Sequence, residues 1–239
     1  MNKNGVRASG IGLFFVLLLA NRYKRYIKRF SIMRINNPSF EIWEQQPGVA
    51  GVYKQIERVG RVCYKSEDHT TADSAQPFVE RMIKNQHYAM LEHGTVYLIF
   101  DKKKVEEIRQ SNNKYYDPYP WYFYASNKFS QVNFDFGNYY VTTNLRVLAE
   151  NNRLNDLKEF WSEPLVSHPK RVTVHFSTQI AISREFNRHR ADSMAEQSTR
   201  YCNYSKAKFG NEITINLPTW IKQAMTGTEW AANVNNGIL

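Results

Sequence analysis

The sequence predicts an α+β fold, with an antiparallel sheet flanked by helices in a single domain. Apolar residues recur at helical spacing early in the body of the chain, and short stretches typical of strands follow them. No internal repeat and no convincing linker divides the body. We therefore expect one hydrophobic core.

The first expected elements are two helices and a strand. Apolar residues between Val49 and Cys63 repeat at helical spacing, which predicts a helix. Asp73 is placed to open a second helix. Gly94 breaks that pattern, and Thr95–Phe100 is predicted to be a strand. The apolar face of the second helix is expected to contain Ala75, Phe78, Val79, Met82 and Ile83.

The middle of the body contains a long polar and aromatic stretch. Residues 101–137 are rich in Asn, Asp, Tyr and Lys, and we expect them to leave the core with weak structure of their own. Tyr139–Thr143 is predicted to be a strand. Short helices are expected around Leu145–Glu150 and Leu154–Trp161, and Pro169 ends the region.

The last expected elements are a strand, a helix and a second short strand. Arg171–Phe176 alternates between apolar and polar residues, which predicts a half-buried strand pairing antiparallel with Thr95–Phe100. A helix is expected to begin at Ser177, and Ile213–Leu217 is predicted to be a strand. The apolar contacts of that helix would be Ile180, Ile182 and Phe186.

The net charge of +10 is unevenly distributed. Residues 1–33 carry seven Lys and Arg and no acid, so the remainder carries 10 − 7 = +3. This mildly basic body argues against a protein that coats nucleic acid, and we expect no nucleic-acid partner. The two cysteines, Cys63 and Cys202, indicate neither a disulfide framework nor a zinc site, so a cytoplasmic location is expected.

The N-terminal segment contains a ten-residue apolar run, Ile11–Ala20, which is too short to cross a bilayer as a helix. Three interpretations remain: a membrane-surface anchor, a poor signal peptide, or an extension that the mature protein does not need. Because globular patterning begins at Met33, we favour an extension over residues 1–32, outside the fold and without stable membrane association. The folded domain would then be 33–239.

A dense polar cluster lies near the C-terminal end of the chain. Asn187–Arg190 (NRHR) is followed after seven residues by Ser198–Tyr201 (STRY). Arginine forks bind phosphate bidentately, so the cluster indicates a site for phosphate-bearing anions. Arg188 and Arg190 are two residues apart and would point to nearly opposite sides of one helix. We therefore expect a helix to end about here.

Structural interpretations of the same residues remain open. Ser193 and Glu196 fit a capping box for a following turn about as well as a catalytic pair. The arginines would also fit a solvated helix end that forms ion pairs with Glu185 and Asp192.

Other kinds of site find little support. His87 and His93 lack the spacing of a helical metal pair, and no metal site is expected. Neither cysteine has a neighbouring base that would make it a nucleophile. Because no glycine-rich phosphate loop appears, side chains would have to hold any nucleotide.

The cluster resembles the signature of the flavin-dependent thymidylate synthases. Its residues read R-H-R-x-x-S-x-x-E-x-S-x-R-Y from Arg188 to Tyr201, a long and specific pattern. The segment from His87 to Glu92-His93 is similar to the second motif of that family, and Arg61–Ser66 (RVCYKS) is similar to its early segment. The resemblance covers residues 33 to about 220, except for an insert at about 101–170.

The resemblance implies an α+β fold and a homotetramer whose active sites are built from several subunits. It implies the reductive methylation of dUMP to dTMP. Methylenetetrahydrofolate would supply the carbon, and NADPH would reduce bound FAD, whose hydride replaces a cysteine nucleophile.

The resemblance also implies roles for individual residues. The residues that would contact FAD are His87, Arg188, His189, Arg190 and Glu196. The residues that would hold dUMP are Arg188, Glu196, Gln197, Ser198, Thr199 and Arg200, with Ser198 and Arg200 in catalytic roles. Ala89 stands where many relatives carry Ser or Thr, and Glu185 where several carry Gln.

Two departures accompany the resemblance. No Arg follows Arg200, and we find no match to the C-terminal ligands of the family, so a truncated C-terminus with weakened flavin binding is expected. The insert has no assigned role. The alternative is a non-enzymatic nucleic-acid-binding module that uses the basic N-terminus and the aromatic insert, although core and interface positions are the favoured explanation for those aromatics.

Overall fold

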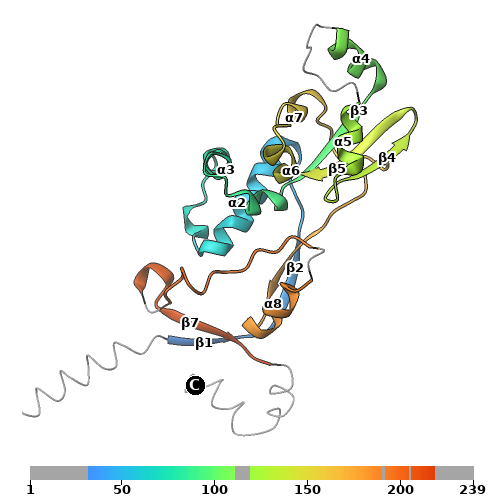
Figure 1. Cartoon of the computed structure of the whole chain (residues 1–239). Helices are drawn as coiled ribbons and strands as arrows, with labels where there is room; N and C mark the ends of the chain where they lie inside the picture. Colours follow the sequence, from blue (N-terminus) through green and yellow to red (C-terminus); the bar gives the residue numbers. More distant parts are fainter. Residues whose placement is uncertain (1–31, 111–118, 190–191, 205, 219–239) are drawn as a thin grey trace, which may run out of the picture. The chain divides into compact units, whose positions relative to one another are not determined.

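The computed structural model describes residues 32–110, 119–189, 192–204 and 206–218 (Figure 1). It is an α+β protein with small sheets and helices. Backbone contacts group the chain into two units, one from Ser39 to Tyr201 and one that combines the residues before and after it. This grouping differs from the single domain expected over 33–239. The expected N-terminal extension lies outside the described residues apart from residue 32.

The larger unit is built on a three-stranded antiparallel sheet in the order β3 (Thr95–Phe100), β5 (Asn138–Asn144), β4 (Gln131–Asp135). The strands predicted at 95–100 and 139–143 are therefore confirmed. Val96, Leu98 and Val141 are fully buried, because one face of the sheet packs against helices.

Two helices with strong apolar faces pack against each other and contribute to the same core as this sheet. α2 (Gly48–Tyr64) buries Val52 and Ile56, and α3 (Ala75–Lys84) buries Phe78 and Val79, as the spacing predicts. The short 3-10 helices η1 (Glu67–His69) and η2 (Tyr88–His93) connect them to each other and to β3. Gly94 is required at the η2–β3 junction, because a Cβ there would lie 2.5 Å from the Ile56 side chain.

The stretch from 101 to 137 does not leave the core, and that prediction is wrong for its described residues. It forms α4 (Lys102–Gln110), α5 (Pro120–Ser126) and β4. Val105 and Tyr124 are buried in the same core as Phe100 and Phe160. The Tyr124 hydroxyl donates to Asp156 Oδ2 over 2.8 Å, so the polar end of this buried side chain has a hydrogen-bond partner.

Two short helices follow β5, as predicted. α6 (Leu145–Glu150) begins after Asn144, whose side-chain oxygen accepts a hydrogen bond from Val147 N over 3.0 Å. α7 (Asp156–Glu159) is shorter than the expected 154–161. Trp161 instead forms a bridge to Leu98 of β3.

The strand β6 (Thr173–Ser177) pairs antiparallel with β2 (Ser39–Trp43) and not with β3, so the predicted pairing is wrong. Both edges of β3 are already occupied, one by β5 and the other by residues 160–162. α8 (Ile180–Phe186) follows β6, near the predicted start. The predicted half-burial fails for Val172, Val174 and Phe176, which are exposed.

The smaller unit contains β1 (Ile32–Asn36), β7 (Glu212–Asn216) and the 3-10 helix η3 (Ala207–Phe209). β1 and β7 pair in parallel, with Arg34 opposite Thr214. The strand predicted at 213–217 is thus present one residue earlier, with a partner from the other end of the body. Among the described residues, no helix has the length and apolar character needed to span a membrane.

Candidate functional site

The polar cluster begins where α8 ends, as the sequence predicts. The helix ends at Phe186, and two further turn bonds follow, from Arg188 N to Glu185 O and from His189 N to Phe186 O. Arg190, expected to contact FAD, lies outside the described residues. Because the helix ends here, the residues of the cluster are not restricted to one face of a helix.

Arg188 and His189 both present exposed side chains. Arg188 Nη1 lies 3.2 Å from Glu185 Oε2, and 77% of the Arg188 side chain is exposed. The ion pair expected from the structural interpretation is therefore present. An ion pair this exposed is worth little free energy, so it leaves the guanidinium available to an anionic ligand.

Glu196 is held by α8 and does not complete a capping box. Its Oε1 accepts a hydrogen bond from Ser183 Oγ over 2.6 Å, and its Oε2 accepts one from Asn187 Nδ2 over 3.2 Å. Arg184 Nη1 lies 3.6 Å from the same Oε2. No helical turn follows Ser193, since residues 193–198 have no regular structure. The capping-box alternative is therefore wrong, because α8 side chains already satisfy the carboxylate.

Ser198 anchors the second half of the cluster to the end of α2. Its backbone N donates to Cys63 O over 2.9 Å, which satisfies one of the carbonyls that a helix leaves unpaired at its C-terminus. Its hydroxyl accepts a hydrogen bond from Tyr201 N over 3.1 Å. Tyr201 also meets Tyr64 edge to face, with ring centroids 5.5 Å apart. These contacts bring the 61–66 segment and the 196–201 segment together.

The other residues expected to hold dUMP lie beside Ser198. Gln197 is half-buried, whereas Thr199 and Arg200 are exposed in a turn. The structure thus places one carboxylate, two hydroxyls and one guanidinium of the predicted site on a single irregular segment.

His87 and His93 differ in their surroundings. His87 is exposed and precedes η2, and among the described residues no hydrogen bond, ion pair or ring contact joins its side chain to the 188–200 segment. His93 is half-buried, and burial lowers the pKa of its imidazole below its ordinary value while the charge of Glu92 acts in the opposite direction. Among the described residues, its Nε2 has no hydrogen-bond partner. Glu92 forms an ion pair with Arg146 of α6.

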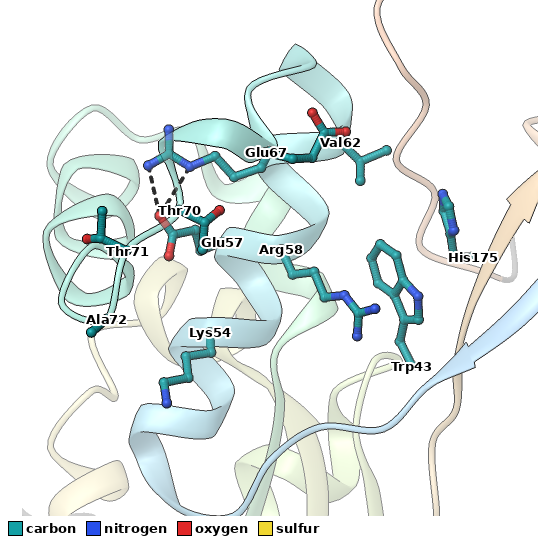
Figure 2. A pocket seen from close by; sticks show the side chains of 11 residues that line it. Trp43, Lys54, Glu57, Arg58, Val62, Glu67, Thr70, Thr71, Ala72 and His175 are labelled. Atoms are coloured by element: carbon teal, nitrogen blue, oxygen red, sulfur yellow. Dashed lines mark hydrogen bonds and ion pairs between the residues drawn. The ribbon is translucent and has the colours of Figure 1, made fainter.

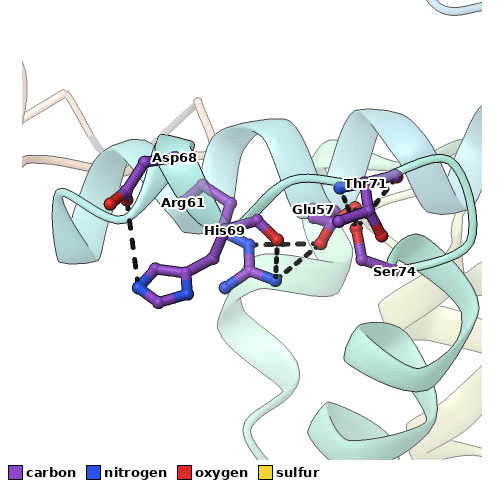
Figure 3. Close-up of polar contacts among 6 residues, drawn as sticks. All are labelled: Glu57, Arg61, Asp68, His69, Thr71 and Ser74. Carbon is purple, nitrogen blue, oxygen red and sulfur yellow. Dashed lines mark hydrogen bonds and ion pairs between the residues drawn. The ribbon is translucent and has the colours of Figure 1, made fainter.

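Arg61, in the early segment of the resemblance, has a structural role. Its Nε and Nη2 donate to Oε1 of Glu57, over 3.1 and 2.8 Å, while Ser74 Oγ donates to the other oxygen (Figure 3). Glu57 is only 2% exposed, and a buried carboxylate requires such partners. Arg61 Nη2 also lies 3.4 Å from His69 O.

A cavity of about 570 Å³ lies along α2, between the η1–α3 connection and the β2–β6 pair (Figure 2). The Arg58 guanidinium lies 3.7 Å from the centre of the Trp43 ring, and the His175 ring stacks on Trp43 at 4.5 Å. Sequence reasoning missed this cavity, because it depends on the pairing of β2 with β6. None of the predicted site residues lines it.

No group of three or more His, Cys, Asp and Glu residues is arranged to hold a metal ion within the described ranges. Cys63 and Cys202 are free thiols. Comparison of the chain with protein-family models, with curated proteins and with solved structures gave no match.

Proposed function

We propose that the chain is a flavin-dependent thymidylate synthase, which methylates dUMP to dTMP with methylenetetrahydrofolate, FAD and NADPH. The observation that carries the proposal is the hydrogen bond from Ser198 N to Cys63 O. It joins two segments, 61–66 and 196–201, that are far apart in sequence and that each resemble a segment of that family. A chance match in sequence gives no reason for the two to meet in space.

The chemistry of the cluster fits the phosphates of FAD and dUMP. Arg188 and Arg200 are exposed guanidiniums, and charge-assisted bonds to phosphate are stronger than those between neutral groups. Arg188, His189 and Arg190 would hold FAD, with His87 as a further contact. Bound FAD would carry hydride from NADPH to the incoming carbon unit.

The dUMP side of the site would be built on the irregular segment. Ser198 Oγ accepts from Tyr201 N, so its own proton remains to be donated to a ligand oxygen. Gln197, Thr199 and Arg200 would bind beside it. Glu196, whose carboxylate accepts hydrogen bonds from Ser183 and Asn187, would lie between the two ligands.

A homotetramer is part of the proposal, and the outer face of the β2–β6 pair supports it. We call this face, together with Phe186 of α8, the ribbon surface. Phe186 stacks on Phe176 at 5.2 Å. Contiguous exposed apolar side chains mark protein interfaces. The side chains of the strand pair on this surface are Phe40, Ile42, Val174 and Phe176, which are all exposed.

We also propose a cytoplasmic location for this activity. Cys63 and Cys202 are free thiols, and reducing compartments preserve free thiols.

The test is flavin binding followed by complementation. The purified chain should take up added FAD, seen as flavin absorbance, and complementation of a thymidine-requiring strain then measures whether its activity is impaired. Arg188→Gln should weaken FAD binding by about 10- to 100-fold, because it removes a charge-assisted bond worth about 1.5–3 kcal/mol. The matched control is Lys84→Gln, which removes an exposed charge at the end of α3 and should leave binding unchanged. A folded protein that neither retains nor binds added FAD would refute the proposal.

A further inference from the structure

A row of aromatic rings begins on the edge strand β4, crosses to β5 and continues onto α5. Phe134 lies 4.8 Å from Tyr139, its cross-strand partner, and Tyr139 stacks on Trp121 at 4.3 Å and 8°. Trp121 in turn meets Tyr119 at 5.5 Å. Figure 1 shows α5 beside the hairpin. We call these four residues and Phe136 the aromatic row. Its inner members Trp121 and Tyr139 are half-buried and pack against the core, whereas Phe134, Phe136 and Tyr119 are exposed.

Phe136 at the tip of the hairpin is held in a strained conformation. Phe136 and Gly137 both have positive φ, 46° and 80°, which is the geometry of a tight two-residue turn. Asn, Asp and Gly suit the first of these positions, whereas a bulky side chain in the left-handed region is disfavoured. The Phe136 side chain is 88% exposed, so it gains no burial in return. Strain without a packing benefit is typical of a functional contact.

A cation lies beside the row. Lys102 Nζ is 5.4 Å from the centre of the Phe134 ring, and Lys102 begins the run Lys102-Lys103-Lys104. Of these three, Lys103 pairs with Glu107 at 3.9 Å and Lys104 donates to Glu159 O. Lys102 has neither an ion pair nor a hydrogen bond within the described part of the chain.

The nearby carboxylates are already engaged. Asp135 follows Phe134 and accepts a hydrogen bond from Ser167 Oγ over 2.6 Å. Asp101 accepts one from the backbone N of Lys103 over 2.7 Å. Within the described residues neither carboxylate pairs with Lys102, so its ammonium group remains available to an anion beside the exposed rings Phe134 and Phe136.

We propose that the aromatic row binds single-stranded nucleic acid, with Phe134 and Phe136 stacking on bases and Lys102 neutralising phosphate. Exposed rings with an adjacent cation are the combination that single strands require. A membrane surface would favour aliphatic side chains gathered at one tip, whereas this row runs along a sheet face onto a helix. This activity does not depend on the proposed synthase reaction, and it departs from the sequence-based expectation of no nucleic-acid partner.

The experiment measures the anisotropy of a fluorescein-labelled oligothymidylate of about 20 nucleotides with the full chain, without flavin. Binding should be saturable and should weaken as salt rises from about 50 to 200 mM. Phe136→Asn should weaken binding about tenfold, the loss of one stacked base. Because Asn suits the turn, this variant should melt no lower than the parent chain, which separates lost binding from lost folding.

Two further variants locate the contact. Lys102→Gln should reduce the slope of log K against log salt by about 0.7, the value for one phosphate contact on a single strand. Tyr122→Ala is the matched control, since Tyr122 is an exposed ring of α5 outside the row, and it should bind like the parent. The basic residues of the N-terminal segment contribute the same background to every variant.

Three outcomes would overturn the proposal. One is the absence of saturable binding at low salt. Another is equal affinity of the Phe136→Asn and Tyr122→Ala variants. The third is tighter binding to vesicles containing phosphatidylserine than to the oligonucleotide, with Phe136→Asn abolishing the vesicle binding. That result would assign the row to a membrane surface.

Discussion

The ribbon surface and the exposed rings of the aromatic row are both apolar, but they differ in composition. The ribbon surface combines aliphatic Ile42 and Val174 with phenylalanine rings. Among the described residues no cation lies over its rings. The row contains only aromatic rings and has Lys102 beside Phe134. Exposed hydrophobic area therefore does not specify a partner by itself, and the accompanying side chains distinguish a second protein chain from a polyanion.

The largest expected effect is on the ribbon surface. Phe176→Asp would place a charge in the centre of the proposed subunit interface, where burying it unpaired costs several kcal/mol. We expect the tetramer to dissociate, with at least a thousandfold weaker association by the conversion of about 1.4 kcal/mol per tenfold. The measurement is molar mass by light scattering during size-exclusion chromatography.

The control for this change is Phe134→Asp in the aromatic row, which should leave the molar mass unchanged. If both variants dissociate the assembly, the two surfaces serve the same purpose and the comparison fails.

The second effect concerns the support beneath the row. Tyr124→Phe removes the hydroxyl that donates to buried Asp156, leaving that carboxylate with Arg153 Nη1 at 3.4 Å. We expect the free energy of unfolding to fall by about 1–3 kcal/mol, measured by urea denaturation. Tyr122→Phe, the same change on an exposed ring, should leave the free energy of unfolding unchanged within experimental error. Equal losses of stability in the two variants would mean that the buried hydrogen bond of Tyr124 does not support the row.

The sequence predicts elements well where one face is buried. The helix at 49–63 and the strand at 95–100 follow from apolar spacing alone, because the core imposes that spacing. The sequence could not predict which edge of β3 is free to pair with another strand. β6 alternates like a strand that pairs with β3, but backbone groups of residues 160–162 already occupy that edge. Exposed Phe40 and Ile42 carry no burial signal, so β2 was missed.

The site shows the same division. The end of α8 near Arg188 is predictable, because it follows from two arginines at a spacing unsuited to one helical face. The anchor from Ser198 to Cys63 is not, since a bond between two backbone groups leaves no trace in side-chain identity. Glu196 fits a local capping box by sequence, but three donors of α8 bind it instead.

The third effect is on the pH dependence of stability, through a histidine packed on the sheet that carries the row. His168 is buried against Tyr97 of β3 and Tyr140 of β5, where burial lowers the pKa of its imidazole. Nδ1 accepts from Leu165 N over 3.0 Å, and Nε2 lies 3.1 Å from Leu98 O, so this arrangement requires the neutral ring.

Because the unfolded chain binds this proton at higher pH than the folded one, stability is fully present above about pH 6.5 and falls as pH decreases below it. The lowered pKa of His93 changes stability with pH in the same direction. His168→Gln should reduce the slope of unfolding free energy against pH between about pH 5 and 7. An unchanged slope would exclude His168 as its source.

The smallest effect is on the turn of the row. Phe136→Asn should raise the free energy of unfolding by up to about 1 kcal/mol, because it relieves the left-handed conformation. Asn152, exposed at φ 58°, provides the reciprocal control, and Asn152→Ala should lower stability by a similar amount. Thermal melts of both variants measure this. A stabilised Asn152→Ala protein would show that strain at such positions is not the governing factor.

The parallel pairing of β1 with β7 has a consequence for biosynthesis. Ile32 is matched with Glu212, so the strand that opens the body has no partner until the last part of the body has been translated. The larger unit, from Ser39 to Tyr201, lies entirely between them and can fold first as the chain emerges. Closing so long a loop is slow, because entropy must be lost before any contact repays it. We therefore expect the pairing of β1 with β7 to form after the larger unit on a nascent chain.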